Sequence, residues 1–267
     1  MAIHQVPKRV VIKTRVAWLQ VVHLQKPIPF PMRDSWHTPI LVSLVILVQV
    51  MLGLSPETDR LTWELENFPV WLGLVLLMIT HRHFPLSDLC LRLFGLHSLI
   101  ISVGGYYSWG NVPLGDSIAG VLGADRNAFY FLSHFMHGFV PAIFFRELIL
   151  RTSFVGHSRW LDFLVLCVCV ASGVFMNFVG MFLSLVLGKA AQNFVGPRGG
   201  PWDTEWQLLI GTVGAMGSLF FLSRSHDRFL GALHARQTVH ASRRRGVAQP
   251  KVGAVLLPVQ EHDSQAS

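Results

Sequence analysis

The chain has 267 residues, of which 51% are hydrophobic and 14% charged, and its formal net charge is +7. In an average soluble domain about a quarter of the residues are charged, so this composition excludes an ordinary soluble enzyme and indicates a membrane protein. The length suffices for one membrane domain with short tails and leaves no room for a soluble domain of useful size.

Six apolar segments follow one another along the chain. In order, they are residues 39–54, 68–80, 89–107, 128–150, 160–188 and 206–222. A helix that crosses a bilayer needs about 20 residues, so the second segment is short and needs independent support. Taken together, the segments predict an all-α fold, a polytopic membrane bundle of six transmembrane helices.

The positive charges support the second span and set the orientation. With both termini in the cytoplasm, 18 of the 22 lysines and arginines lie on the cytoplasmic side, which is the side they favour in membrane proteins. The four exceptions are Arg60, Arg126, Lys189 and Arg198. Removing the second span would move the arginines at 243–245 to the outside. The pattern therefore predicts six spans with both termini cytoplasmic.

Two basic segments flank the predicted membrane domain at residues 36–223. Residues 1–35 form a cytoplasmic segment that can include an interfacial helix. Residues 224–267 are predicted to be a basic, largely disordered cytoplasmic tail. Its triplet Arg243, Arg244 and Arg245 is expected at the membrane surface, where anionic lipid headgroups attract each charge by about 1 kcal/mol. Charge beside the membrane explains the value of +7, so the expected partner is the lipid bilayer and not nucleic acid.

The remaining segments are predicted to be loops and apolar filler. Residues 55–66 are interpreted as an acidic outer loop and 106–127 as a turn-rich one. Cys90, Cys167 and Cys169 do not suggest a disulfide framework, and small apolar packing is the simplest interpretation of them.

Four ionisable residues form a candidate site. His97 lies midway along the third span, and His134 and His137 lie three residues apart on one face of the fourth. Asp203 lies at the outer mouth of the sixth span. Because ionisable residues in spans usually face the bundle interior, these side chains are predicted to converge on an outward-facing polar pocket. Imidazole and carboxylate groups suit zinc binding, general acid–base chemistry or a proton path.

A structural role is the alternative for these histidines. In that interpretation they hydrogen-bond Ser98, Ser133, Tyr130 or backbone groups between helices. Farther along the fourth span, Glu147 with Arg146 and Arg151 is interpreted as a local ion pair at the cytoplasmic edge. No cofactor is evident from the sequence, and whether a metal binds is left open.

A series of motifs resembles the YjdF-like family of bacterial inner-membrane proteins. The motifs are Leu96-His97-Ser98, Gly104-Gly105-Tyr106-Tyr107, Arg126-Asn127, Ser133-His134-Phe135, Gly138 to Ala142, Arg146-Glu147, Pro201 to Trp206 and Gly214-Ala215. The resemblance implies a multi-pass membrane protein, and the biochemical role of that family is not established. A looser resemblance to VanZ-like membrane proteins involves His134 and Asp203, with Tyr130 standing where that family has an aspartate.

The chain departs from the YjdF-like pattern at several positions where that family has ionisable residues. The residues found there are Tyr130, Phe131, Met176, Val179, Gly200 and Gln207. Fewer carboxylates favour a non-enzymatic role. Two alternatives stay open: a membrane-embedded enzyme or lipid-headgroup binder that uses the His/Asp pocket, and a small-solute transporter.

Overall fold

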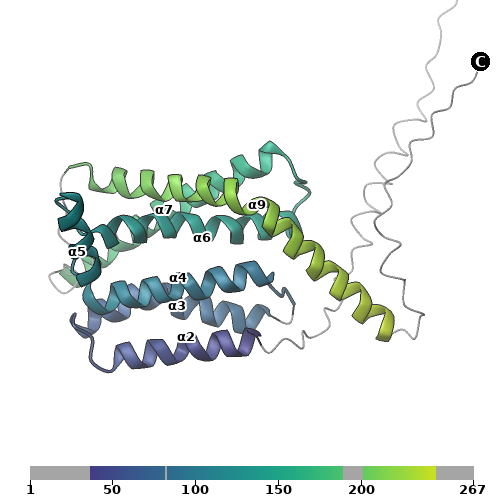
Figure 1. Ribbon diagram of the computed structural model, residues 1–267, viewed down its shortest axis with the longest axis horizontal. Helices are drawn as coiled ribbons and strands as arrows, with labels where there is room; N and C mark the ends of the chain where they lie inside the picture. The colour runs from purple at the N-terminus through teal and green to yellow at the C-terminus, as the bar shows by residue number, and fades with distance from the viewer. Residues whose placement is uncertain (1–36, 82, 189–200, 245–267) are drawn as a thin grey trace, which may run out of the picture.

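The computed structural model describes residues 37–81, 83–188 and 201–244, and every regular element within them is a helix (Figure 1). The helices are α2 (His37–Gly53), α3 (Arg60–Thr80), α4 (Asp88–Tyr107), α5 (Pro113–Leu122), α6 (Ala128–Thr152), α7 (Arg159–Leu187) and α9 (Asp203–Arg244). The predicted all-α class is therefore confirmed. The basic segment 1–35 and Arg245 lie outside the described residues.

Five of these helices are long and apolar enough to cross a membrane: α3, α4, α6, α7 and the part of α9 at Asp203–Ala235. A shorter apolar helix covers Thr38–Gly53. Helix α7 is the least buried of the five, since only 6% of its most apolar stretch is buried inside the bundle. Large apolar side chains that face outward over most of a helix are suited to lipid and not to water.

The second span is longer than predicted because α3 begins at Arg60 and not near residue 68. Asp59 caps its first turn by accepting a hydrogen bond from the Thr62 backbone at 3.0 Å. The helix has 21 residues, so it no longer falls short of a bilayer. The predicted outer loop at 55–66 is accordingly wrong over its second half, and Glu66 lies inside a helix.

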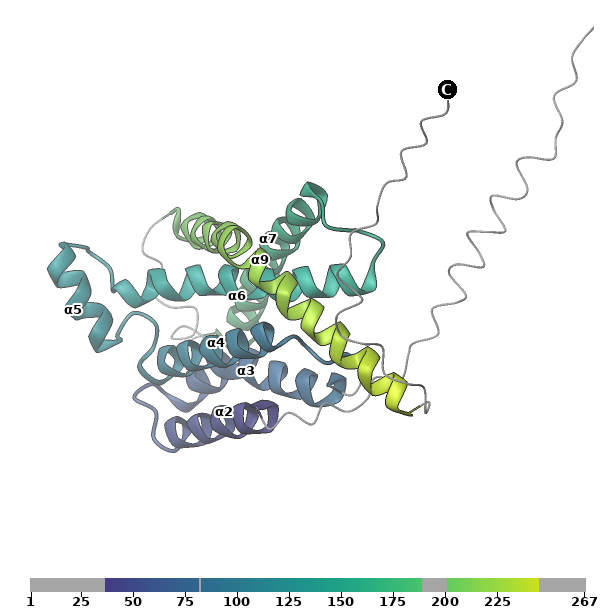
Figure 2. The same cartoon turned by 45° about the vertical axis from the view of Figure 1, so that its right-hand side comes forward.

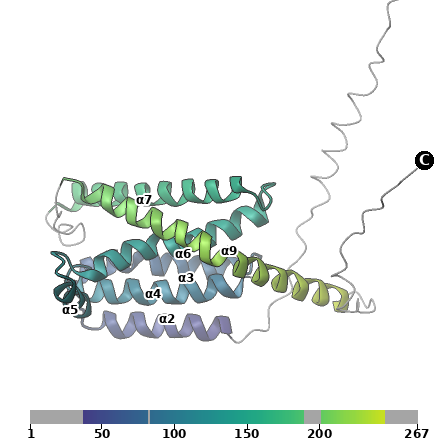
Figure 3. The same ribbon diagram turned by 45° about the horizontal axis from the view of Figure 1, so that its top comes forward.

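The last helix also differs from the prediction. The segment 206–222 belongs to α9, which runs for 42 residues to Arg244, so the tail is helical from 224 to 244 and not disordered. Asp203 and Glu205 in its first turn complement the positive end of the helix dipole. The C-terminal part of α9 extends beyond the other helices, as Figures 1 and 3 show.

The helices form two groups that meet along α4 and α6 (Figure 2). The first group, α2 to α4, shares a core of Val45, Val70, Leu74 and Ile101. The second, α6, α7 and α9, shares a core of Ala142, Leu161, Val165, Cys169, Ala215 and Leu219. Between the groups, Cys90 and Leu93 of α4 pack against Met136, Val140 and Ile143 of α6.

Two glycines allow α6 and α9 to cross at backbone contact. A Cβ atom on Gly138 would collide with the carbonyl of Gly211, and one on Gly214 would collide with the carbonyl of Phe135. Small residues at such crossings let helices approach closely. In a membrane this matters because lipid is as apolar as the side chains, so close packing and not the hydrophobic effect holds the helices together. This crossing brings the start of α9 next to the start of α6.

Candidate functional site

Asp203 anchors a polar cluster at the end of the bundle where α9 begins. Its buried carboxylate accepts a hydrogen bond from Arg126 at 2.5 Å, from the Tyr130 hydroxyl at 3.0 Å and from Gln207 at 3.2 Å. The hydrogen bond to Asp203 raises the pKa of the Arg126 guanidinium, so Arg126 keeps its positive charge at neutral pH. Asn127 caps α6 directly after Arg126 and fixes where α6 starts.

The three predicted histidines continue from Tyr130 toward the middle of the bundle. The ring of His134 lies 4.5 Å from that of Tyr130 and 6.1 Å from that of His137. His137 in turn lies 5.0 Å from His97 of α4, measured between ring centroids. The structure therefore places all four predicted residues in one neighbourhood. We call this set, His97, Tyr130, His134, His137 and Asp203, the His–Asp cluster.

The hydrogen bond of His137 to Ser133 determines which ring nitrogen is left to accept a hydrogen bond from a ligand. Its Nδ1 lies 2.6 Å from the backbone carbonyl of Ser133, one turn earlier in α6. A carbonyl can only accept, so Nδ1 carries a proton, and in the neutral imidazole Nε2 is then an acceptor. The His137 side chain keeps an exposed surface. Nε2 of the neighbouring His97 is buried without a partner among the described residues.

The alternative that the histidines form hydrogen bonds between helices is supported only in part. The hydrogen bond of His137 to Ser133 stays within α6 and does not join two helices. Trp109, which was not among the predicted site residues, also borders the cluster, with its ring 5.6 Å from that of His137. It follows Ser108, whose φ of 64° turns the chain back after α4. Nothing in the sequence around Trp109 pointed to this position.

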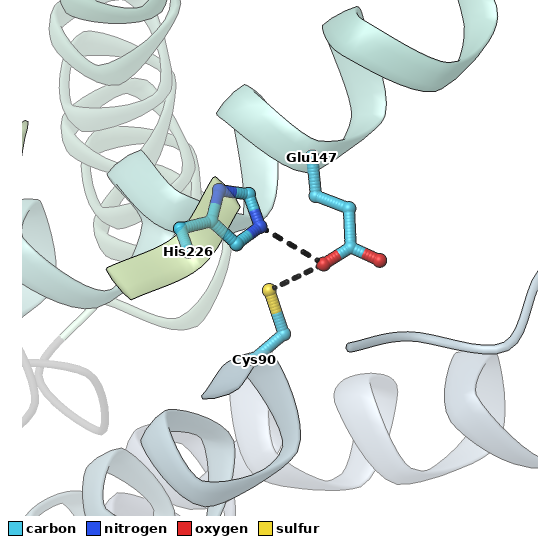
Figure 4. A group of neighbouring side chains, drawn as sticks. All are labelled: Cys90, Glu147 and His226. Carbon is cyan, nitrogen blue, oxygen red and sulfur yellow. Dashed lines mark hydrogen bonds and ion pairs between the residues drawn. The ribbon is translucent and has the colours of Figure 1, made fainter. Parts of the chain in front are cut away.

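A second polar cluster, unforeseen in its extent, joins the start of α4, the last turns of α6 and the middle of α9. Figure 4 shows three of its members. The fully buried Glu147 carboxylate accepts hydrogen bonds from the Ser87 backbone at 3.0 Å and from Arg151 at 2.7 Å. It also lies 3.1 Å from Nε2 of His226 and 3.1 Å from Sγ of Cys90. We call these five residues the Glu147 cluster.

Cys90, Glu147 and His226 form the one group of three or more possible metal ligands found within 4.8 Å of one another among the described residues. The surroundings of His226 oppose a metal there. Its Nδ1 lies 2.9 Å from Arg146, which can only donate, so Nε2 carries the proton and donates to Glu147. A histidine that binds a metal normally donates from its second nitrogen to an acceptor. The Glu147 cluster therefore fits a structural role, in which it holds α4, α6 and α9 together by hydrogen bonds, better than it fits a metal site.

The sequence interpretation of this end was partly right. Glu147 and Arg151 form the expected local ion pair. Arg146, however, pairs with Asp227 at 2.6 Å. Cys90 is not mere apolar filler, because its thiol lies within hydrogen-bond distance of Glu147. Glu147 and His226 are 79 residues apart, so no local sequence signal could have joined them.

Buried ionisable clusters inside a bundle with an apolar exterior are characteristic of a multi-pass membrane protein. The comparisons agree, since residues 38–228 match the family described as "Predicted membrane protein (DUF2238)", and the chain belongs to this family. It is similar to the inner membrane protein YjdF of Escherichia coli (strain K12), with 36% identity over 184 residues, 69% of this chain and 88% of that protein. No solved structure matches the chain. The chain is thus an inner-membrane protein, as the motifs predicted.

Proposed function

We propose that the membrane domain has six spans with both termini in the cytoplasm. The apolar helix at Thr38–Gly53 supplies the sixth span beside the five longer ones. Its parent helix α2 has 17 residues, the lower limit of what crosses a bilayer. The excess of lysine and arginine on one side of this zigzag supports the orientation. In it, the His–Asp cluster faces outward and the Glu147 cluster lies at the cytoplasmic edge.

We further propose that the His–Asp cluster binds the polar headgroup of an outer-leaflet lipid. The observation that carries this proposal is the exposed His137, whose Nδ1 is fixed by Ser133 and whose Nε2 is left as an acceptor. An N–H or O–H group of a ligand can donate to that nitrogen. Arg126 at the mouth is partly exposed and can face a phosphate while its pairing with Asp203 is retained.

The chemistry of the site selects among headgroups. The ammonium of phosphatidylethanolamine has N–H donors for His137, whereas the quaternary ammonium of phosphatidylcholine has none. A preference for the first lipid is therefore expected, and it should depend on His137. A hydrogen bond from a charged donor contributes about 1.5–3 kcal/mol, and 1.4 kcal/mol corresponds to a tenfold change in affinity. The expected preference is accordingly about tenfold to a hundredfold.

Native mass spectrometry of the purified protein with each lipid tests this. The wild type should retain phosphatidylethanolamine over phosphatidylcholine, and His137→Phe, which keeps an aromatic ring but loses the acceptor, should remove the difference. His83→Ala, an exposed histidine in the connection between α3 and α4, is the matched control and should behave as wild type. Equal retention of the two lipids by the wild type, or an unchanged preference in His137→Phe, would refute a headgroup site at His137.

A further inference from the structure

Glu66 stands apart from the other carboxylates of the bundle. It lies in α3 with only 4% of its surface exposed, and neither carboxyl oxygen has a hydrogen-bond partner among the described residues. Glu147 and Asp203, by contrast, are both paired with arginine. Glu66 is next to the backbone of α4, since a Cβ atom added to Gly105 would lie 3.4 Å from the Cβ of Glu66. An unpaired buried carboxyl within a membrane span requires a physical explanation.

No positive charge in the described residues faces Glu66. Helix α2 contains no aspartate, glutamate, lysine or arginine. In α4, Arg92 lies over the ring of Phe229, and His97 faces His137. In α3 itself, Arg60 is directed to the Leu54 carbonyl. The charged group that does act on Glu66 is Asp59, which has the same sign.

Two other polar atoms of α2 and α3 in this region are buried without a hydrogen-bond partner among the described residues: the Gln49 amide oxygen, an acceptor, and the Trp63 indole nitrogen, a donor. The Gln49 amide donates to Asn67 at 3.0 Å and to Ser102 at 2.9 Å. Asn67 adjoins Glu66 in sequence, and a Cβ atom on Gly105 would meet it as well. An ionised carboxylate would add further acceptors and a bare charge, and burial of such a charge costs several kcal/mol. A proton on Glu66 removes the charge and supplies a donor.

We propose that Glu66 is held as a protonated carboxylic acid and forms an exchangeable proton-binding site between α2, α3 and α4. Exchange with water is expected because Glu66 lies six residues after Arg60, or about 9 Å along α3 at 1.5 Å per residue. At this end, Thr58 donates to the carbonyl of Gly105 at 3.0 Å, so the loop before α3 closes directly over the end of α4.

The proton site and the His–Asp cluster lie against different faces of α4. Gly105 faces Glu66 and Asn67, whereas a Cβ atom on the adjacent Gly104 would collide with Trp109, the neighbour of His137. The glycine pair thus lets α4 pack closely on two faces. The proton site does not depend on lipid binding at His137, and each can fail without the other.

Infrared spectroscopy of the purified full chain tests the proposal. A protonated carboxylic acid has a C=O stretch that is separate from the bands of carboxylates and of the peptide backbone. At pH 7 the wild type should show this band, and Glu66→Gln, which resembles the neutral acid in shape, should lose it. Glu64→Gln is the matched control, an exposed glutamate two residues away in the same helix, and should keep the band.

Exchange of the proton is measured by transfer into D2O, where the band should shift to lower frequency. If the band is absent from the wild type at pH 7, or persists unchanged in Glu66→Gln, Glu66 is not the protonated acid. A band that does not shift in D2O would overturn the exchangeable site. Should Glu66→Gln not fold, the wild-type spectrum decides, because Glu147 and Asp203, the other buried carboxylates of the described residues, are ion-paired.

Discussion

At the scale of single residues, the buried charges differ in how they are stabilised. Glu147 is surrounded by donors from three parts of the chain: the Ser87 backbone, Arg151 and His226. Asp203 is neutralised by Arg126 at the opposite end of the bundle. Glu66 has no such partner among the described residues and is expected to hold a proton instead. The same side-chain chemistry therefore serves as a structural latch, as part of a candidate ligand site and as a candidate proton site.

The Glu147 cluster predicts a large stability effect. Glu147→Gln removes the negative charge that balances Arg151 while keeping the side-chain size, and loss of one partner of a buried pair costs about 3–5 kcal/mol. We expect a clear loss of resistance to thermal or denaturant unfolding in detergent. Glu205→Gln, an exposed residue in the first turn of α9, should change the free energy of unfolding by no more than about 0.5 kcal/mol. Equal stability of the two variants would show that the latch contributes little.

At the scale of elements, the crossing of α6 and α9 determines which polar groups meet. Gly138 and Gly214 bring the two backbones together, so Tyr130 reaches Asp203 and Glu147 reaches His226. Both contacts lie on the same pair of helices, one at the start of α6 and of α9, the other near the end of α6 and midway along α9. A change in the separation of α6 and α9 would therefore affect both clusters at once.

Gly138→Ala should disrupt this crossing. The added methyl group would collide with the carbonyl of Gly211, which cannot move without shifting α9. Overpacking typically costs about 1–3 kcal/mol, and the unfolding midpoint should fall. Gly231→Ala is the control, since an added Cβ there meets nothing within 4 Å. It should stabilise α9 by up to about 1 kcal/mol through helix propensity. Loss of stability in both variants would argue against a specific crossing.

At the scale of the whole molecule, lipid is the solvent for most of the outer surface. Large apolar side chains are exposed along α7, including Phe182, Leu185 and Val186. The polar clusters lie inside or at the two ends of the bundle, where α9 passes from Asp203 to His226. Those residues are 23 positions apart, or about 35 Å along a helix, which is close to the thickness of a bilayer.

Reporter fusions test the proposed topology. A reporter that is active only outside the cytoplasm should be active when inserted at Gly123, after α5, and inactive when fused after Ser267. A cytoplasmic fluorescent reporter should give the opposite pattern. If both positions report the same side, the six-span topology with cytoplasmic termini is wrong.

The sequence alone determined the class of protein, its family and most of its helices. Hydrophobicity and charge are local properties of a segment, and they decide whether that segment inserts into a bilayer and in which orientation. The sequence also identified His97, His134, His137 and Asp203 as neighbours, because each lies at a definable depth in its span. It misplaced the start of α3 and the end of α9, where polar residues continue a helix beyond its apolar part. It also missed α5, because the segment 106–127 was predicted to be a turn-rich loop and contains a helix at Pro113–Leu122. Only the tertiary structure decided that Glu66 is buried with no partner in the described part of the chain and that Glu147 meets His226. Such contacts depend on which helix faces pack together, and that choice is made between segments far apart in the chain.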